Sequence, residues 1–259
     1  MSNQSTTTFL AIGDVHGQWH RVIDAISEAS ELLGHAPDMA LQVGDAEALR
    51  SEAEMAMVAG PRKYVSLGEF SVLKEGDLPC PVYFVAGNHE PYMALDLAEE
   101  STRQRPIPWG PDVFYLGRSG ALELHGLNVA WLSGIYRPTR FDTRGNGKKS
   151  NYHYTAADIE KTKHEAKELG AIDVLVTHDW PHGLERGRGT EHILDLNVSL
   201  RPQLHLCGHM HAFHQDVIGK AHVHALNAVP SPMMGDDRFG WWRLYEMRDR
   251  RIRSVHVGG

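Results

Sequence analysis

Short apolar runs, each closed by a polar turn, recur along the chain and alternate with helical patterns. The first run covers residues 8–13, and a helix is expected from about residue 18 to residue 33. The apolar residues of this helix repeat every three to four positions: Trp19, Val22, Ile23, Ile26, Ala29 and Leu33. The same succession of strand, turn and helix recurs with a strand at 38–43 and the turn Gly44-Asp45. The helix after this turn would carry Ala48, Leu49, Met55 and Ala56.

Further apolar runs predict strands in the middle and in the tail of the chain. Three of them are "PVYFVAGNHE" (81–90), "AIDVLVTHDWP" (171–181) and "QLHLCGHMH" (203–211). Between them, "VFYLG", "ALELHG" and "LNVAWLSGI" are expected to be short antiparallel strands, and a helix is expected from about 155 to 169. Three strand-like runs follow at 222–229, 240–247 and 251–257. We predict an α/β fold in which two mixed β-sheets pack as a sandwich flanked by helices.

Five of these strands end in Asp, Asn or His, mostly with a glycine just before. In α/β folds the carboxyl ends of the strands are where ligands bind. A glycine beside such a residue gives the turn room, because it has no Cβ; the glycines concerned are Gly13, Gly44, Gly87 and Gly208. The strand-end residues are Asp14, His16, Asp45, Asn88, His89, His178, His209 and His211.

This set of side chains suits two divalent cations that share a bridging ligand. Imidazole favours Mn, Fe or Zn, and a carboxylate is the usual bridge. Each motif alone would more often be structural, but five in order at strand ends are hard to explain as packing. Two such cations could bind phosphoryl oxygens and lower the pKa of a bridging water, giving a metal-bridging hydroxide.

Composition narrows the class of protein further. The chain has 259 residues, of which 42% are hydrophobic, so a single domain over 1–259 with a sizeable core is expected. The formal charge of −7 gives no general attraction to nucleic acid or anionic membrane. Two cysteines, no basic N-terminal region and no long apolar segment lead us to expect a cytoplasmic protein without a membrane partner. Nothing in the sequence indicates an oligomeric state.

In combination, "GDVHG", "GD", "GNHE", a lone His after an apolar strand, and "GHMH" resemble the calcineurin-like metallophosphoesterases over residues 8–211. By position, the resemblance implies one metal on Asp14, His16, Asp45 and His211. It implies a second metal on Asp45, Asn88, His178 and His209, with Asp45 bridging. His89 would then be the catalytic His, which contacts the phosphate and assists the leaving group as a general acid. For His89 the alternative is a group that only positions Asn88.

Within that family the chain looks most like the RNA lariat debranching enzymes. Ser/Thr protein phosphatases continue the second motif with Asp-Arg-Gly, whereas this chain has "GDAEALRSEAEM". That segment, "PRKYVSLGEF", "GNHE", "YHYT" and above all "THDWP" resemble the debranching enzymes from about residue 9 to 230. The resemblance implies hydrolysis of a 2′,5′-phosphodiester at an RNA branch point, with branched or single-stranded RNA as the candidate partner.

The polar loop at 136–154 would help to hold such a lariat. Its basic residues could meet phosphates, and its tyrosines could stack on bases. The residues concerned are Arg137, Arg140, Arg144, Lys148, Lys149, Tyr136, Tyr152 and Tyr154. The alternative is a solvated loop whose basic residues offset an acidic protein.

Three departures from the debranching enzymes leave other functions open. Asp14 stands where the eukaryotic enzymes commonly have Cys, the loop lacks a Cys-Pro-Pro element, and the chain stops near the end of the resemblance. These departures suggest a shorter, prokaryotic type of relative whose substrate need not be a lariat. The alternatives are a phosphomonoesterase or small-nucleotide phosphodiesterase, and an inactive scaffold or binding protein. The complete ligand set and His89 argue against the scaffold.

Overall fold

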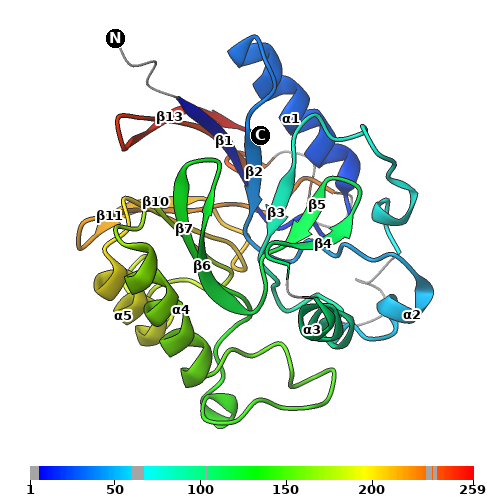
Figure 1. The fold of residues 1–259 in the computed structure, drawn as a ribbon, viewed down its shortest axis with the longest axis vertical. Coiled ribbons are helices and arrows are strands. Elements are labelled where there is room, and N and C mark those ends of the chain that lie inside the picture. Colours follow the sequence, from blue (N-terminus) through cyan, green and yellow to red (C-terminus); the bar gives the residue numbers. More distant parts are fainter. Residues whose placement is uncertain (1–5, 60–66, 103, 232–234, 236–237) are drawn as a thin grey trace.

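Two β-sheets packed face to face form the centre of the protein, and helices cover their outer faces (Figure 1). The computed structural model describes residues 6–59, 67–102, 104–231, 235 and 238–259. The predicted α/β sandwich of two mixed sheets is confirmed. Residues 61–66, the first part of "PRKYVSLGEF", lie outside the described residues.

The first sheet contains seven strands in the order β13-β12-β1-β2-β3-β5-β4. Strands β1, β2, β3 and β5 run parallel, while β12 pairs antiparallel with both β1 and β13. The strands are β1 (Thr7–Ile12), β2 (Met39–Gln42), β3 (Val82–Phe84), β4 (Ile107–Gly110), β5 (Val113–Tyr115), β12 (Trp242–Arg248) and β13 (Arg251–Gly258).

The second sheet contains six strands in the order β10-β11-β9-β8-β7-β6. Here β7, β8, β9 and β11 run parallel, and β6 and β10 are antiparallel edges. The strands are β6 (Ser119–Leu124), β7 (Leu127–Leu132), β8 (Val174–Thr177), β9 (Leu204–Cys207), β10 (His214–Ile218) and β11 (Ala221–Ala225).

Alternation along the strands divides the core into layers. In β1, Phe9 and Ala11 face the second sheet, whereas Leu10 and Ile12 face a helix, because successive side chains point to opposite faces. Helices α1 (Trp19–Leu33) and α3 (Tyr92–Ser101) pack on the first sheet, and α4 (Ala156–Leu169) and α5 (Glu191–Leu200) pack on the second. None of the described helices could cross a bilayer.

Two local expectations are wrong. The helix expected after Asp45 is only the single turn α2 (Glu52–Met55), because residues 45–50 run as irregular backbone into the core. There the Ala48 carbonyl accepts a hydrogen bond from Trp109 Nε1 at 2.7 Å. The run "VFYLG" gives β5, which pairs parallel with β3 in the first sheet instead of joining β6 and β7.

Buried His205 on β9 makes the stability of the protein depend on pH. Its Nε2 shares a hydrogen bond of 2.9 Å with Thr177 Oγ1, and its Nδ1 has no partner. Burial lowers the pKa of His205 from 6.5 to about 3. Below about pH 6.5 His205 binds a proton in the unfolded state but not in the folded state. The free energy of unfolding therefore falls as the pH falls toward the pKa of the folded state.

We expect His205→Gln to flatten this dependence. Between pH 6 and 4, the free energy of unfolding should fall with a slope shallower by up to about 1.4 kcal/mol per pH unit than in the parent protein. Urea denaturation at several pH values measures the slope. His222→Gln, which changes an exposed ring on the neighbouring strand, should leave the slope unchanged. Equal slopes for His205→Gln and the parent protein would refute a buried, uncharged His205.

Candidate metal centre

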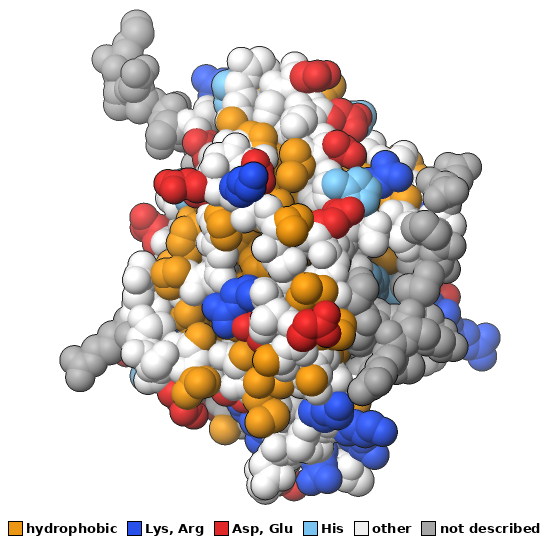
Figure 2. Space-filling model, turned by 90° about the vertical axis from the view of Figure 1, so that its right-hand side faces the viewer, with side chains coloured by type: hydrophobic (Ala, Val, Ile, Leu, Met, Phe, Trp, Pro, Cys, Tyr) orange, Lys and Arg blue, Asp and Glu red, His pale blue; other side chains and the backbone are white. Residues whose placement is uncertain are grey.

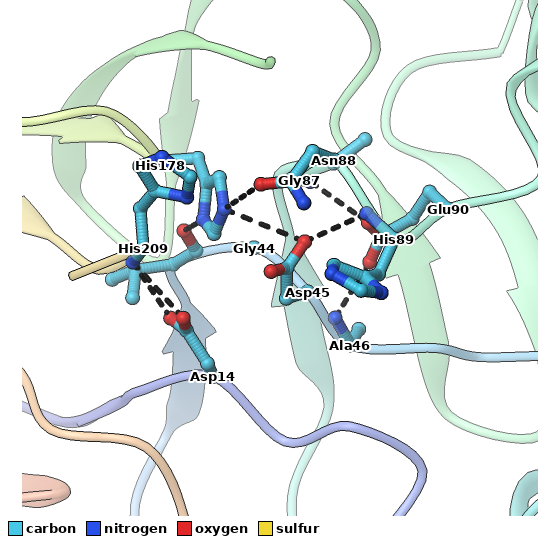
Figure 3. A network of polar contacts seen from close by, with 12 residues as sticks. Asp14, Gly44, Asp45, Ala46, Gly87, Asn88, His89, Glu90, His178 and His209 are labelled. Atoms are coloured by element: carbon cyan, nitrogen blue, oxygen red, sulfur yellow. Dashed lines mark hydrogen bonds and ion pairs between the residues drawn. The ribbon is translucent and has the colours of Figure 1, made fainter. Parts of the chain in front are cut away.

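The turns that follow the parallel strands meet at one edge of the sandwich, where both sheets present their carboxyl ends (Figure 3). The structure brings together all eight strand-end residues expected from the sequence. Asp14 and His16 follow β1, Asp45 follows β2, and Asn88 and His89 follow β3; His178 follows β8, and His209 and His211 follow β9.

Ligand atoms gather in two groups that share one carboxylate. In the first group the atoms offered by Asp14, His16, Asp45 and His211 all lie within 4.8 Å of one another. The second group contains Asp45, His178 and His209 within the same limit. Asn88 Oδ1 lies 3.4 Å from His178 Nε2, beside this second group. The grouping coincides with the two ligand sets that the resemblance implies, with Asp45 in both.

The imidazoles are oriented as cation ligands would be. His178 Nδ1 lies 2.9 Å from the Val43 carbonyl and donates to it, so Nε2 is the nitrogen left to face Asp45, at 3.4 Å. His16 Nδ1 is engaged by Glu47 at 3.0 Å, and its Nε2 lies 3.0 Å from His211 Nε2. Two ring nitrogens this close need a positive charge or a proton between them. The donor set therefore fits divalent cations.

The two aspartates of the centre are each held by the backbone of another turn. The His209 amide donates to both oxygens of Asp14, at 3.1 and 3.0 Å. The His89 amide donates to Asp45 Oδ1 at 2.8 Å. Asp14 and Asp45 are almost completely buried, so these bonds fix their orientation and repay part of their desolvation.

Glycines make these close approaches possible. A Cβ on Gly87 would lie 2.2 Å from Asp45 Oδ1, and one on Gly208 would lie 2.2 Å from Asp14 Oδ1. A Cβ on Gly44 would lie 2.3 Å from His178 Nδ1. At these three positions the absence of a Cβ leaves the space that the ligand side chains occupy.

Four of the candidate ligands adopt the left-handed backbone conformation although none is glycine. Their φ values are 47° for His16, 52° for Asp45, 68° for His209 and 49° for His211. This conformation is costly for L-residues and persists only where the surroundings impose it. The bonds to Asp14 and Asp45 and the bond from the His16 amide to the Asp45 carbonyl supply that constraint.

The electrostatics of the centre couple its acids to its imidazoles. Burial opposes charge on every group, but the neighbouring charges prevail. The pKa of Asp45 lies well below its ordinary value because His178 and His89 are close. Burial would lower the pKa of His16 and of His178, yet the surrounding carboxylates raise them to about 9 and about 10. Such a cluster of carboxylates favours positive charge at this point of the fold.

Glu47 is a residue of the centre that sequence reasoning missed. It is fully buried, and its Oε1 lies 3.0 Å from His16 Nδ1 and 3.4 Å from His89 Nδ1, so Glu47, His16 and His89 form a third group of potential ligands. Burial raises the pKa of Glu47, although His16 acts against it. The signal was its spacing: Glu47 follows Asp45 by two residues, as His16 follows Asp14.

The loop at 136–154 starts beside the centre, but only some of its candidate residues are available to a substrate. The Gly134 amide donates to the Ala86 carbonyl at 2.7 Å and the Tyr136 amide to Asp179 at 2.9 Å, which ties the loop to the strand ends. Arg137, Arg140, Lys148 and Lys149 are exposed. Figure 2 shows basic side chains gathered at the lower end of the molecule, where Figure 1 places this loop.

The expectation that Tyr154 stacks on a base is wrong, because its ring is buried and its hydroxyl bonds Thr190 at 2.9 Å. Arg144 is occupied by Asp158, the N3 residue of the α4 capping box. Tyr152 is half-buried against the core of the first sheet. The exposed part of the candidate surface is therefore basic, with Tyr136 and Tyr152 partly accessible at its base.

Gly87→Ala should reduce metal binding, because its Cβ would clash with the side chain and the amide nitrogen of Asp45. The added Cβ would displace the Asp45 carboxylate, so we expect the apparent affinity for Mn²⁺ to fall 10- to 100-fold. Gly147→Ala in the loop is the matched control, because there the nearest atom would lie 3.6 Å away. Metal content after dialysis measures both. Full occupancy in Gly87→Ala would contradict the placement of Asp45.

Comparison with known proteins agrees with this geometry. A family profile described as "Calcineurin-like phosphoesterase" matches residues 7–213. The lariat debranching enzyme of Drosophila melanogaster is 28% identical over 187 residues, which are 66% of this chain and 33% of that enzyme. The lariat debranching enzyme of Saccharomyces cerevisiae is 28% identical over 242 residues, covering 77% of this chain and 55% of the enzyme.

The chain thus spans about a third of the length of the first of these relatives. A crystal structure of a Thermus thermophilus protein shares the fold, with a TM-score of 0.61 at 14% identity over 97% of this chain and 99% of that one. The family profile covers most of the chain, and the His/Asp cluster characteristic of the family is present. The chain belongs to the calcineurin-like phosphoesterases, a family of metal-dependent phosphoesterases.

Proposed function

We propose that this protein hydrolyses a phosphodiester in RNA, with the 2′,5′-linkage of a branch point as its preferred bond. The observation that carries the proposal is an exposed basic loop rooted at the dinuclear centre. The similarity to lariat debranching enzymes, over 66% and 77% of this chain in the two relatives named, supports the choice of RNA.

Two bound divalent cations would stabilise the phosphoryl oxygens as Lewis acids and activate a water. We assign Asp14, His16 and His211 to one of them, Asn88, His178 and His209 to the other, and Asp45 to both. Mn, Fe and Zn all suit this mixture of imidazole, carboxylate and amide oxygen.

His89 acts as the general acid in this proposal. Its ring lies at the rim of the centre with 19% of the side chain exposed, whereas the Asp45 side chain is only 2% exposed. The backbone amide of His89 is fixed on Asp45, so the ring stays beside the bridging carboxylate. Nδ1 of the ring faces Glu47 Oε1 at 3.4 Å, and Nε2 is left to donate to the departing oxygen.

The loop would hold the nucleic acid. Arg137 and Arg140 leave the end of β7 a few residues after Gly134, which is bound to the Ala86 carbonyl next to Gly87. Their guanidinium groups are exposed, and they provide local positive charge on an acidic protein. Phosphate contacts of this kind position a strand and weaken with salt.

His89→Ala should lower turnover 100- to 10,000-fold while both metals stay bound, because removal of a general acid costs about this much. Metal analysis and single-turnover kinetics on the same preparation test it. Asp45→Ala is the contrasting variant and should lose metal from both positions. If His89→Ala loses a metal, His89 belongs with His16 and Glu47 as a ligand, and the acid role is wrong.

The substrate is tested with Mn²⁺-loaded protein on four compounds: a branched 2′,5′-linked RNA, its linear 3′,5′ counterpart, a simple phosphodiester and a simple monoester. We expect the branch to be cleaved fastest. Arg137→Gln/Arg140→Gln should raise KM for the branched RNA about tenfold and leave simple esters unaffected. Lys163→Gln/Lys167→Gln, which removes the same two positive charges from α4, is the control.

Cleavage of simple diesters alone would leave the centre intact as a phosphodiesterase and remove RNA from the proposal. Preference for the monoester would move the protein to the phosphomonoesterases. No cleavage with two metals bound would favour an inactive scaffold.

A further inference from the structure

A second site lies at the open edge of the sandwich, between the outermost strands of the two sheets. A cavity of about 700 Å³ is lined there by residues of β10 and β11 on one side and of β12 and β13 on the other. We call it the edge cavity. None of its lining residues belongs to the metal centre. Arg243 and Tyr245 pair with Ala11 and Phe9 inside β1, so they lie along the strands and not at their carboxyl ends.

The unusual feature of the edge cavity is a buried arginine with neutral partners. Arg243 is only 8% exposed, and its Nε donates to Ser254 Oγ at 2.6 Å. A second nitrogen donates to Gln215 Oε1 at 3.0 Å. Within the described part of the chain, no carboxylate forms an ion pair with Arg243. A charge buried without a counter-charge is costly, and an anion bound in the cavity would offset that cost.

Arg118 shows what a purely structural arginine looks like in the same protein. Its side chain is equally buried, but its guanidinium forms a two-point ion pair with Asp96 at 2.6 and 2.7 Å. Both guanidinium groups lie over a tyrosine ring, that of Arg118 over Tyr92 and that of Arg243 over Tyr245, so the difference is the carboxylate. The fold therefore supplies a carboxylate to one buried arginine and leaves the other facing a cavity.

The other charged residues of the lining are mostly basic. Lys220 and Arg251 also line the edge cavity, and Asp216 is the one carboxylate among the lining residues. Asp216 Oδ1 is engaged by the neighbouring Val217 amide at 2.7 Å. Three cations against one carboxylate leave two net positive charges, on a chain whose total is −7. This balance matches a phosphate monoester, which carries about two negative charges at neutral pH.

The size and walls of the cavity indicate an organic ligand. About 700 Å³ falls within the range of small-molecule sites and is far more than an inorganic phosphate needs. Leu204 and Ile252 line it beside the rings of His222 and Tyr245. Tyr245 is held by His224, whose Nδ1 lies 2.6 Å from its hydroxyl. These apolar and aromatic groups can cover the uncharged part of a ligand.

We propose that the edge cavity binds a small organic phosphate of mononucleotide size, with the phosphate on Arg243, the remainder against His222 and Ile252, and Lys220 adding positive charge at the rim. Arg243 would supply a charge-assisted hydrogen bond to the phosphate, and Ser254 and Gln215 hold its guanidinium in place. The site is separate from the metal centre and does not depend on which phosphate ester the centre hydrolyses.

Calorimetric titration of the full chain with AMP tests the proposal. The titration is done with EDTA present, so that no divalent cation can hold the nucleotide, and repeated with Asp45→Ala. We expect one AMP per chain in both proteins. Arg243→Gln should weaken binding about tenfold or more, and Lys220→Gln several-fold. Lys220 is exposed, so its variant tests the site even if Arg243→Gln destabilises the fold.

Arg253→Gln is the matched control, because it removes one positive charge from β13, the strand paired with β12, and Arg253 does not line the edge cavity. It should bind AMP as the parent protein does. The proposal is overturned if AMP does not bind, or if Arg243→Gln and Lys220→Gln bind it unchanged. Equal affinity for inorganic phosphate would overturn the organic ligand.

Discussion

The metal centre depends on hydrogen bonds between turns that follow different strands. Asp14, after β1, is held by the His209 amide after β9; Asp45, after β2, is held by the His89 amide after β3. The first of these bonds joins the two sheets, and the second joins neighbouring strands of one sheet. The ligands therefore converge only where the two sheets are packed together, so the centre depends on the packing of the sandwich.

Glu90 extends this linkage within the first sheet. Its carboxylate is buried and accepts hydrogen bonds from the amides of Ala46 at 2.6 Å, Glu47 at 3.3 Å and Gly87 at 2.9 Å. Burial, with the nearby charge of Asp45, raises the pKa of Glu90 to about 8. Glu90, the final residue of "GNHE", thus holds the turn that carries Asp45 and Glu47 against the turn that carries His89. This contact gives the last residue of the motif a structural role beside the candidate ligands.

The strands and the eight strand-end residues could be predicted because each depends on a local pattern. An apolar run of four to six residues predicts a buried strand, and the parallel order places its end beside the others. Glu47 could not be predicted in this way, since its role arises from the irregular path of residues 45–50 and from contacts with His16 and His89, distant in the sequence. Burial of Tyr154 likewise depends on α5. Thr190, the N-cap residue of that helix, shares a hydrogen bond with the Tyr154 hydroxyl. Arg243 shows the same limit: nothing local in "GWWRLYEM" says that it faces a cavity.

The left-handed conformation of His16, Asp45, His209 and His211 has a cost in conformational stability. At each of these positions glycine would adopt the backbone at little cost, whereas the present residue costs on the order of 1 kcal/mol or more. Together these four positions therefore cost several kcal/mol of conformational stability, because each carries a side chain in a conformation that favours glycine. A change to glycine would remove this backbone strain at the three histidines, whereas at Asp45 it would also remove the acceptor of the His89 amide. The backbone at these four positions is therefore strained in order to carry the side chains that converge on the centre.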